Sequence, residues 1–108
     1  MKVFFSKHSM DGKYKWTCEN FLKIVGYTKK EIVGVSSYEF FHPEDLMSIV
    51  KSHLNVGSLS QEVTYRLRTK EGKFIWARTF SHAIDDEIIC LTIKLDILQL
   101  IMYKIFGY

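Results

Sequence analysis

Few residues in this sequence are grouped in a way that could support catalysis. His42, Glu44 and Asp45 stand close together, and a histidine beside carboxylates is the usual equipment for general acid–base chemistry. Pro43 lies among them, however, and a proline followed by acidic residues is typical of the first turn of a helix. The sequence contains no GxSxG nucleophile motif, no HExxH zinc motif and no phosphate-binding glycine loop. We therefore expect a binding protein and not an enzyme.

The two cysteines, Cys18 and Cys90, form neither a CxxC pair nor a metal-ligand spacing. Unpaired cysteines of this kind are typical of a reducing compartment, the cytosol or the nucleus. Cys90 stands in an expected strand with no cationic residue beside it, so it is interpreted as an inert, small apolar side chain. No metal site is expected.

The net charge is +3 over 108 residues, and it is spread along the chain. The basic residues form separate pairs: Lys13 and Lys15, Lys29 and Lys30, Arg66 and Arg68. Because a protein that grips phosphates concentrates its positive charge on one face, we expect no direct contact with nucleic acid. The longest apolar stretch, Ile97 to Phe106, falls short of the ~20 residues that cross a bilayer, so no membrane partner is expected.

Hydrophobic periodicity and turn signals predict an α+β fold with a mostly antiparallel sheet. An opening hairpin turns at Asp11-Gly12, short helices with capping signals follow, and a longer helix begins after Pro43. Three strands complete the chain. The expected strands cover residues 3–9, 13–17, 62–69, 74–84 and 87–95, and the longer helix has Pro43 in its first turn and ends at Gly57.

The strand expected over residues 74–84 carries large side chains on one face and small ones on the other. The two sets are Phe74, Trp76 and Phe80, against Ala77, Thr79 and Ser81. Either the large side chains form the core, or the small ones point inward under the helices and leave the large ones for a partner. The pattern alone favours a core of large side chains, because their burial is the stronger driving force.

Several short motifs, in order, resemble the second PAS repeat of basic helix-loop-helix PAS transcription factors. The matching stretches are residues 4–13, 24–27, 31–34, 37–45 and 51–53, with Tyr65-Arg66 and Trp76. Each motif alone is weak, but their order and spacing are specific, and the resemblance runs from Val3 to about Leu95. It is shared with the hypoxia-inducible factor alpha, aryl hydrocarbon receptor nuclear translocator, clock and juvenile hormone receptor branches.

The resemblance implies a PAS fold: a five-stranded antiparallel sheet, with short connector helices and one longer helix across one face. It also implies that the small side chains point inward, which reverses the preference from the pattern. Family members can enclose a ligand cavity, whose lining here would be Phe4, His8, Phe41, Ile49, Ser52, His53, Tyr65, Leu67, Ala77, Thr79, Cys90 and Thr92. The outer side of the sheet would be the dimer interface, formed by Trp76, Phe80, Ile89, Leu91 and Ile93.

The sequence departs from the family at its end. The final hairpin turn, Asp85-Asp86, is short for this family, and nothing from Asp96 onward matches it. We therefore expect a PAS domain over residues 3–95 and an apolar extension over 96–108, which is either a helix or a strand. The extension either packs on the domain or serves as an interaction segment.

The expected function is dimerisation with another PAS domain or a coactivator helix, combined with sensing of a small apolar molecule. Two alternatives remain: a haem sensor with His53 as axial ligand, and a ligand-free dimerisation scaffold. No cofactor is expected, since a single imidazole on an apolar helix face is more often a buried histidine bonded to a backbone group or to Tyr65. The resemblance also implies a protein involved in transcription regulation that is nuclear, with a cytoplasmic phase as an open alternative.

Overall fold

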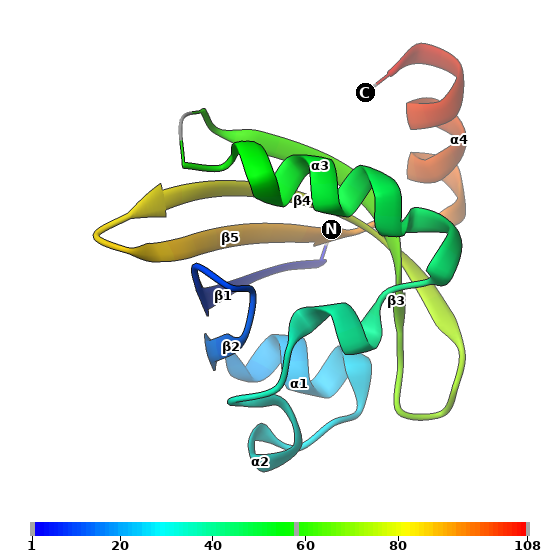
Figure 1. Cartoon of the computed structure of the whole chain (residues 1–108). Helices are drawn as coiled ribbons and strands as arrows, with labels where there is room; N and C mark the ends of the chain where they lie inside the picture. Colours follow the sequence, from blue (N-terminus) through cyan, green and yellow to red (C-terminus); the bar gives the residue numbers. More distant parts are fainter. Residues whose placement is uncertain (1, 58, 108) are drawn as a thin grey trace.

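A computed structural model describes residues 2–57 and 59–107. Figure 1 shows its strands and helices in chain order. They are β1 (Lys2–Ser9), β2 (Tyr14–Thr17), α1 (Glu19–Val25), α2 (Lys29–Ile32), η1 (Ser37–Phe40), η2 (Pro43–Asp45), α3 (Leu46–Asn55), β3 (Gln61–Arg68), β4 (Phe74–Ile84), β5 (Glu87–Lys94) and α4 (Ile97–Phe106).

The five strands form one antiparallel sheet in the order β2-β1-β5-β4-β3. The prediction of an α+β fold with such a sheet is confirmed. The first and last strands of the sequence are neighbours in the sheet, with Lys2 opposite Lys94 and Ser9 opposite Glu87. The sheet is therefore complete only when β1 and β5, which are far apart in the sequence, have paired.

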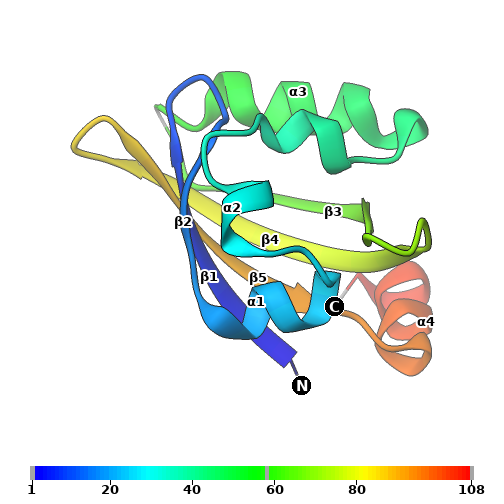
Figure 2. The same ribbon diagram turned by 90° about the horizontal axis from the view of Figure 1, so that it is seen from below.

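The two faces of the sheet are covered differently. Helices α1 and α3 lie on one face, which we call the inner face, and α4 lies at one end of the other face, the outer face (Figure 2). Among the described residues, no helix combines the length and the apolar character needed to cross a bilayer.

The small side chains of β4 point inward. Ala77 is 0% exposed and Thr79 is 7% exposed, while Phe80 is 36% exposed on the outer face. The preference drawn from the pattern alone was wrong, and the orientation implied by the resemblance is the one observed. The physical reason is that the helices bring large side chains of their own, such as Phe21 and Ile49, into the core that the sheet shares with them.

The turns and helix ends follow the local sequence. Asp85 and Asp86 both have positive φ, 49° and 63°, as a two-residue turn between twisted antiparallel strands requires. Thr28 and Glu31 form the expected capping box at α2. The segment predicted as either helix or strand is the helix α4, which begins with a capping box between Asp96 and Gln99.

Candidate ligand cavity and outer sheet face

A cavity of about 90 Å³ lies between the inner face of the sheet and the helices. Nine of the residues predicted for such a cavity line it: His8, Phe41, Ile49, Ser52, His53, Tyr65, Thr79, Cys90 and Thr92. The structure also places residues there that the sequence reasoning missed: Ser6, Gly12, Tyr14, Phe21, Ser37, Tyr38, Val56, Val63, Ser81 and Ile88. Strand alternation would have found some of these, because Ser6 lies two positions from His8 and Ser81 two from Thr79.

Phe4, Leu67 and Ala77 were predicted to line the cavity but do not. All three belong to the packed core, where each is at most 1% exposed. The Phe4 ring packs against the Phe21 ring, with centroids 5.2 Å apart. These residues point to the correct side of the sheet, but neighbouring side chains fill the space around them.

His8 is held in the cavity wall as a neutral imidazole. It is 8% exposed, and its Nε2 lies 2.9 Å from Ser6 Oγ. Burial lowers the pKa of His8 to about 4. A hydrogen bond with the Gly12 backbone raises this pKa in part, and the electrostatic effect of His53 lowers it. Cys90, on the same wall, is buried too, and burial raises the pKa of its thiol to about 12. At neutral pH neither residue therefore brings a charge to the cavity.

Three hydroxyl groups form a chain across the inner face. Tyr65 on β3 and Thr79 on β4 are hydrogen-bonded at 2.8 Å, and Thr79 and Thr92 on β5 at 2.8 Å. Burial raises the pKa of Tyr65 to about 12, so its hydroxyl stays protonated. Among the described residues, the cavity lining includes no Asp, Glu, Lys or Arg. Its polar groups are thus neutral and suited to hydroxyl or carbonyl groups of a ligand.

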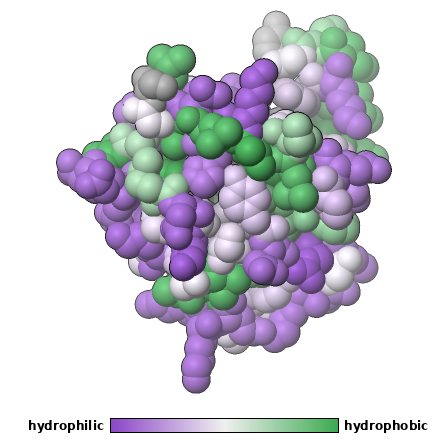
Figure 3. Space-filling model, in the orientation of Figure 1, coloured by the Kyte–Doolittle hydropathy of each residue, from purple (hydrophilic) through white to green (hydrophobic). Residues whose placement is uncertain are grey.

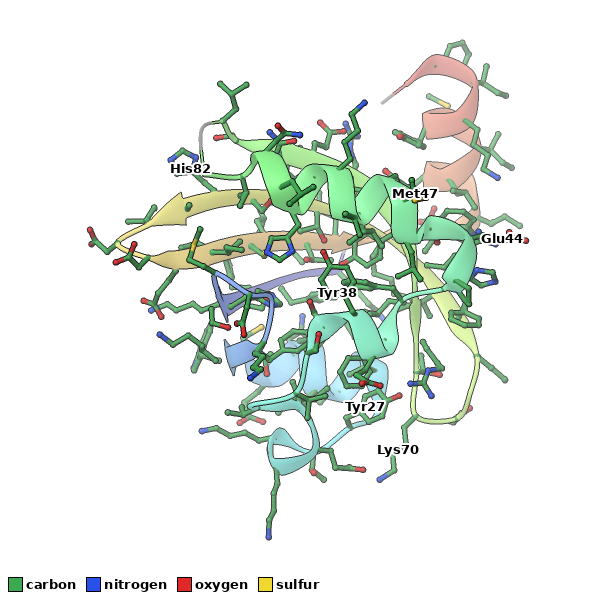
Figure 4. All side chains as sticks on the ribbon, viewed as in Figure 1. Tyr27, Tyr38, Glu44, Met47, Lys70 and His82 are labelled. Carbon is green, nitrogen blue, oxygen red and sulfur yellow. The ribbon has the colours of Figure 1, made fainter. Side chains whose placement is uncertain are left out.

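His53 links α3 to the first hairpin and to η1. Its Nε2 lies 2.6 Å from the carbonyl oxygen of Met10, which can only accept, so this nitrogen donates. The other ring nitrogen, Nδ1, lies 2.7 Å from the hydroxyl of Tyr38, between η1 and α3 (Figure 4). The expected bond to a backbone group is present, with Met10, whereas the side-chain partner is Tyr38 and not Tyr65. Both ring nitrogens are therefore engaged.

Asp45 and Arg66 fasten the start of α3 to β3. The Asp45 carboxylate accepts hydrogen bonds from the Arg66 backbone amide at 2.7 Å, from Nε at 3.1 Å and from Nη2 at 2.9 Å. Burial raises the pKa of Asp45, but the bonds from Arg66 outweigh it and leave the pKa below its usual value. These bonds hold the start of α3 to β3, and α3 in turn contributes Ile49, Ser52 and His53 to the cavity wall.

The outer face carries apolar side chains on three adjacent strands. Phe5 on β1, Leu91 on β5 and Phe80 on β4 are register neighbours, and Phe5 is 52% exposed. Ile89, Ile93 and Trp76 lie on the same face and are partly exposed. The sequence reasoning missed the contributions of β1 and of Trp16, which is 42% exposed. On the helix side of the molecule, hydrophilic and apolar residues are intermixed (Figure 3).

Comparison with known proteins decides the family. A family model described as the PAS fold matches residues 13–91. The chain belongs to the PAS family. The "Aryl hydrocarbon receptor nuclear translocator homolog" of Drosophila melanogaster is 38% identical over 85 residues, which cover 74% of this chain and 13% of that protein. The "Hypoxia-inducible factor 1-alpha" of Gallus gallus is 34% identical over 80 residues, covering 72% and 10%.

Solved structures agree with this assignment. The PAS-B domain of Drosophila melanogaster Cycle, solved with bound ethylene glycol, superposes with a TM-score of 0.79 at 30% identity and covers 85% of this chain and 99% of that one. A LOV protein of Rhodobacter sphaeroides, at 15% identity and a TM-score of 0.78, shares the fold alone. The predicted resemblance to PAS-B domains of basic helix-loop-helix PAS transcription factors is confirmed. The PAS domain spans only about a tenth of the curated relatives it matches.

Proposed function

We propose that this PAS domain is a pairing module of a nuclear transcription regulator and that it holds a small neutral molecule in its interior. The observation that carries the pairing function is the apolar row of Phe5, Leu91 and Phe80 across the outer face. An exposed apolar patch that runs across several strands is typical of a protein interface. The relatives are transcription factors whose PAS-B domains pair with other PAS domains, which supports a PAS domain as the partner and a nuclear location.

Replacement of Phe80 by Glu should weaken pairing without unfolding the domain. Phe80 is already 36% exposed, so the carboxylate stays hydrated in the free domain but is buried on pairing. We expect the dissociation constant to rise about tenfold or more. It can be measured by sedimentation, both for self-association and for binding to the Cycle PAS-B domain.

The matched control for Phe80→Glu is Met47→Glu. Met47 is 84% exposed on α3, on the opposite side of the domain, and this change should leave association unaltered. If Phe80→Glu pairs as well as the unaltered chain, or if Met47→Glu weakens pairing equally, the outer face is not the interface.

The lining and size of the cavity support a small, neutral, hydrogen-bonding ligand. Its volume of about 90 Å³ is below the ~150 Å³ of an engineered cavity that takes benzene. A charged ligand would lose its hydration without meeting an opposite charge. The structure of Cycle PAS-B, described with bound ethylene glycol, and that of its W398A variant, described with bound glycerol, support small polyols as probes.

Ethylene glycol should shift the amide NMR signals of Ser52, Thr79 and Thr92 in a saturable way, with an affinity of about millimolar for so small a molecule. Acetate, which has the same number of non-hydrogen atoms but a negative charge, should not. Replacement of Ser81 by Leu, which places a larger side chain in the cavity, should abolish the saturable shifts. Equal, unsaturated shifts with both compounds would favour the ligand-free scaffold.

The haem alternative finds less support. Both ring nitrogens of His53 are hydrogen-bonded, so His53 would have to release either Met10 or Tyr38 to offer a nitrogen to iron, and the cavity volume is far below that of a porphyrin. We expect no visible absorption band from a protein–haem complex after mixing with haemin, and a band lost in His53→Ala would reinstate this alternative.

A further inference from the structure

The helix α4 occupies part of the face through which pairing is proposed. Lys104 Nζ lies 5.0 Å from the centroid of the Trp76 ring, and the Arg78 guanidinium lies 5.3 Å from that of the Tyr103 ring. Both Trp76 and Arg78 point outward from β4. Figure 2 shows α4 at one end of the sheet, on the side opposite α3. A partner that contacts the outer face around Trp76 would therefore meet α4 first.

The helix is well defined in itself. Asp96 accepts a hydrogen bond from the Gln99 amide at 2.7 Å, and Gln99 Oε1 accepts one from the Asp96 amide at 3.0 Å. Gly107 closes the other end with a φ of 76°, which glycine adopts without strain. These helix-capping contacts involve no residue of the sheet, so α4 would keep them if it left the sheet.

Its attachment to the sheet is shallow. None of the residues of α4, all of which the structure describes, is buried. Six apolar side chains are 40–78% exposed: Ile97, Leu98, Ile101, Met102, Ile105 and Phe106. A helix that is apolar on all sides is normally buried, whereas this one covers only one end of the sheet. The docked position thus leaves most of the apolar surface of α4 in water.

We propose that α4 is a displaceable cap, which competes with the partner domain for the Trp76 end of the outer face. This inference rests on the proposed function, because the competition requires pairing through that face. The hinge is short: the Leu95 amide donates to the Trp76 carbonyl at 2.9 Å, and the helix begins at Ile97. The Arg78 guanidinium, which lies over the Tyr103 ring, also lies 5.2 Å from the centroid of the Phe80 ring, so the row of Phe5, Leu91 and Phe80 begins beside the cap and a partner can engage it before α4 leaves. The α4 segment also lies outside the residues matched by the family model.

The test compares two doubly substituted full-length chains. In the released chain, Tyr103→Gln and Lys104→Gln remove both ring contacts with the sheet, while glutamine preserves helix propensity. In the control chain, Ile97→Gln and Ile105→Gln alter side chains that are 78% and 65% exposed. Trp16→Phe in every chain leaves Trp76 as the single tryptophan.

Two readouts are taken: acrylamide quenching of Trp76 fluorescence, and the dissociation constants for self-association and for Cycle PAS-B. The released chain should show stronger quenching. Its dissociation constant should be about three- to tenfold lower, since a binding-competent state that is rarely populated reduces apparent affinity in proportion. The control chain should match the Trp16→Phe parent in both readouts.

Other outcomes overturn the proposal in distinguishable ways. Unchanged quenching, or an unchanged dissociation constant, means that α4 does not restrict access to Trp76. Weaker pairing in both the released and the control chain makes α4 part of the interface, in which case pairing through the sheet stands and the cap does not. If the folded parent and its variants all fail to associate with either probe, the proposed pairing function fails, and the competition with it.

Discussion

Acidification from pH 7 to about 4 should lower the free energy of unfolding by about 3 kcal/mol through His8 alone. The pKa of His8 is about 4 in the folded domain, against 6.5 for an ordinary histidine. Between these values the unfolded chain binds more protons than the folded one, so stability falls as the pH falls. At about 1.4 kcal/mol for each pKa unit, roughly 2 kcal/mol is already lost by pH 5.

The window between pH 7 and 5 lies largely above the range in which the carboxyl groups contribute to the pH dependence. The pKa values of Glu31, Asp45 and Glu87 are lowered in the folded domain, so their contributions are lost only as the pH falls below the ordinary carboxyl range. Urea unfolding at pH 7, 6 and 5 measures the slope. The control is His8→Gln, which keeps a hydrogen-bonding group but cannot be protonated, and its stability should be nearly flat over this window. An equal slope in His8→Gln would assign the effect to another group.

Replacement of Asp45 by Asn should destabilise the domain by about 2–3 kcal/mol. The carboxylate accepts three hydrogen bonds from Arg66, and its side chain is only 12% exposed. An amide nitrogen in place of one oxygen would face donors of Arg66, and the guanidinium, 22% exposed, would lose its main counter-charge. Urea unfolding at pH 7 measures the loss.

Glu44 provides a matched control, because it binds the same nitrogen of Arg66. Its distance to Nη2 is 3.1 Å, but its side chain is 74% exposed, so Glu44→Gln should cost less than about 0.5 kcal/mol. Asp45→Asn should also remove the acid-induced loss below about pH 4 that comes from the lowered pKa of Asp45. Similar costs for the two changes would mean that charge, and not the buried hydrogen bonds, holds α3 to β3.

The elements of this fold could be read from the sequence because their signals are local. The turns at Asp11-Gly12 and Asp85-Asp86, and the capping box at Thr28, depend on residues a few positions apart. The Asp96 and Gln99 pair carried the same kind of signal for α4, and attention to its spacing would have settled that segment as a helix.

The direction and depth of the side chains could not be read in the same way. Alternation in β4 separates two faces, but which face is covered depends on helices elsewhere in the chain. Depth is harder still: Ala77 and Thr79 point the same way, yet only Thr79 reaches the cavity, because the surroundings of Ala77 are filled. The partner of His53 likewise followed from where η1 lies, which brought Tyr38 and not Tyr65 to its ring.

The pairing of β1 with β5 at the centre of the sheet has a consequence for biosynthesis. Among the strands of this domain β1 is synthesised first and must wait for β5, since their long ladder runs from Lys2 opposite Lys94 to Ser9 opposite Glu87. Contacts between such distant segments slow folding, because a large loop must close before they form. Until β5 emerges, β1 has only the short strand β2 beside it and an unpaired edge open to other chains. The nascent domain therefore exposes this edge to aggregation until β5 has emerged and paired with β1.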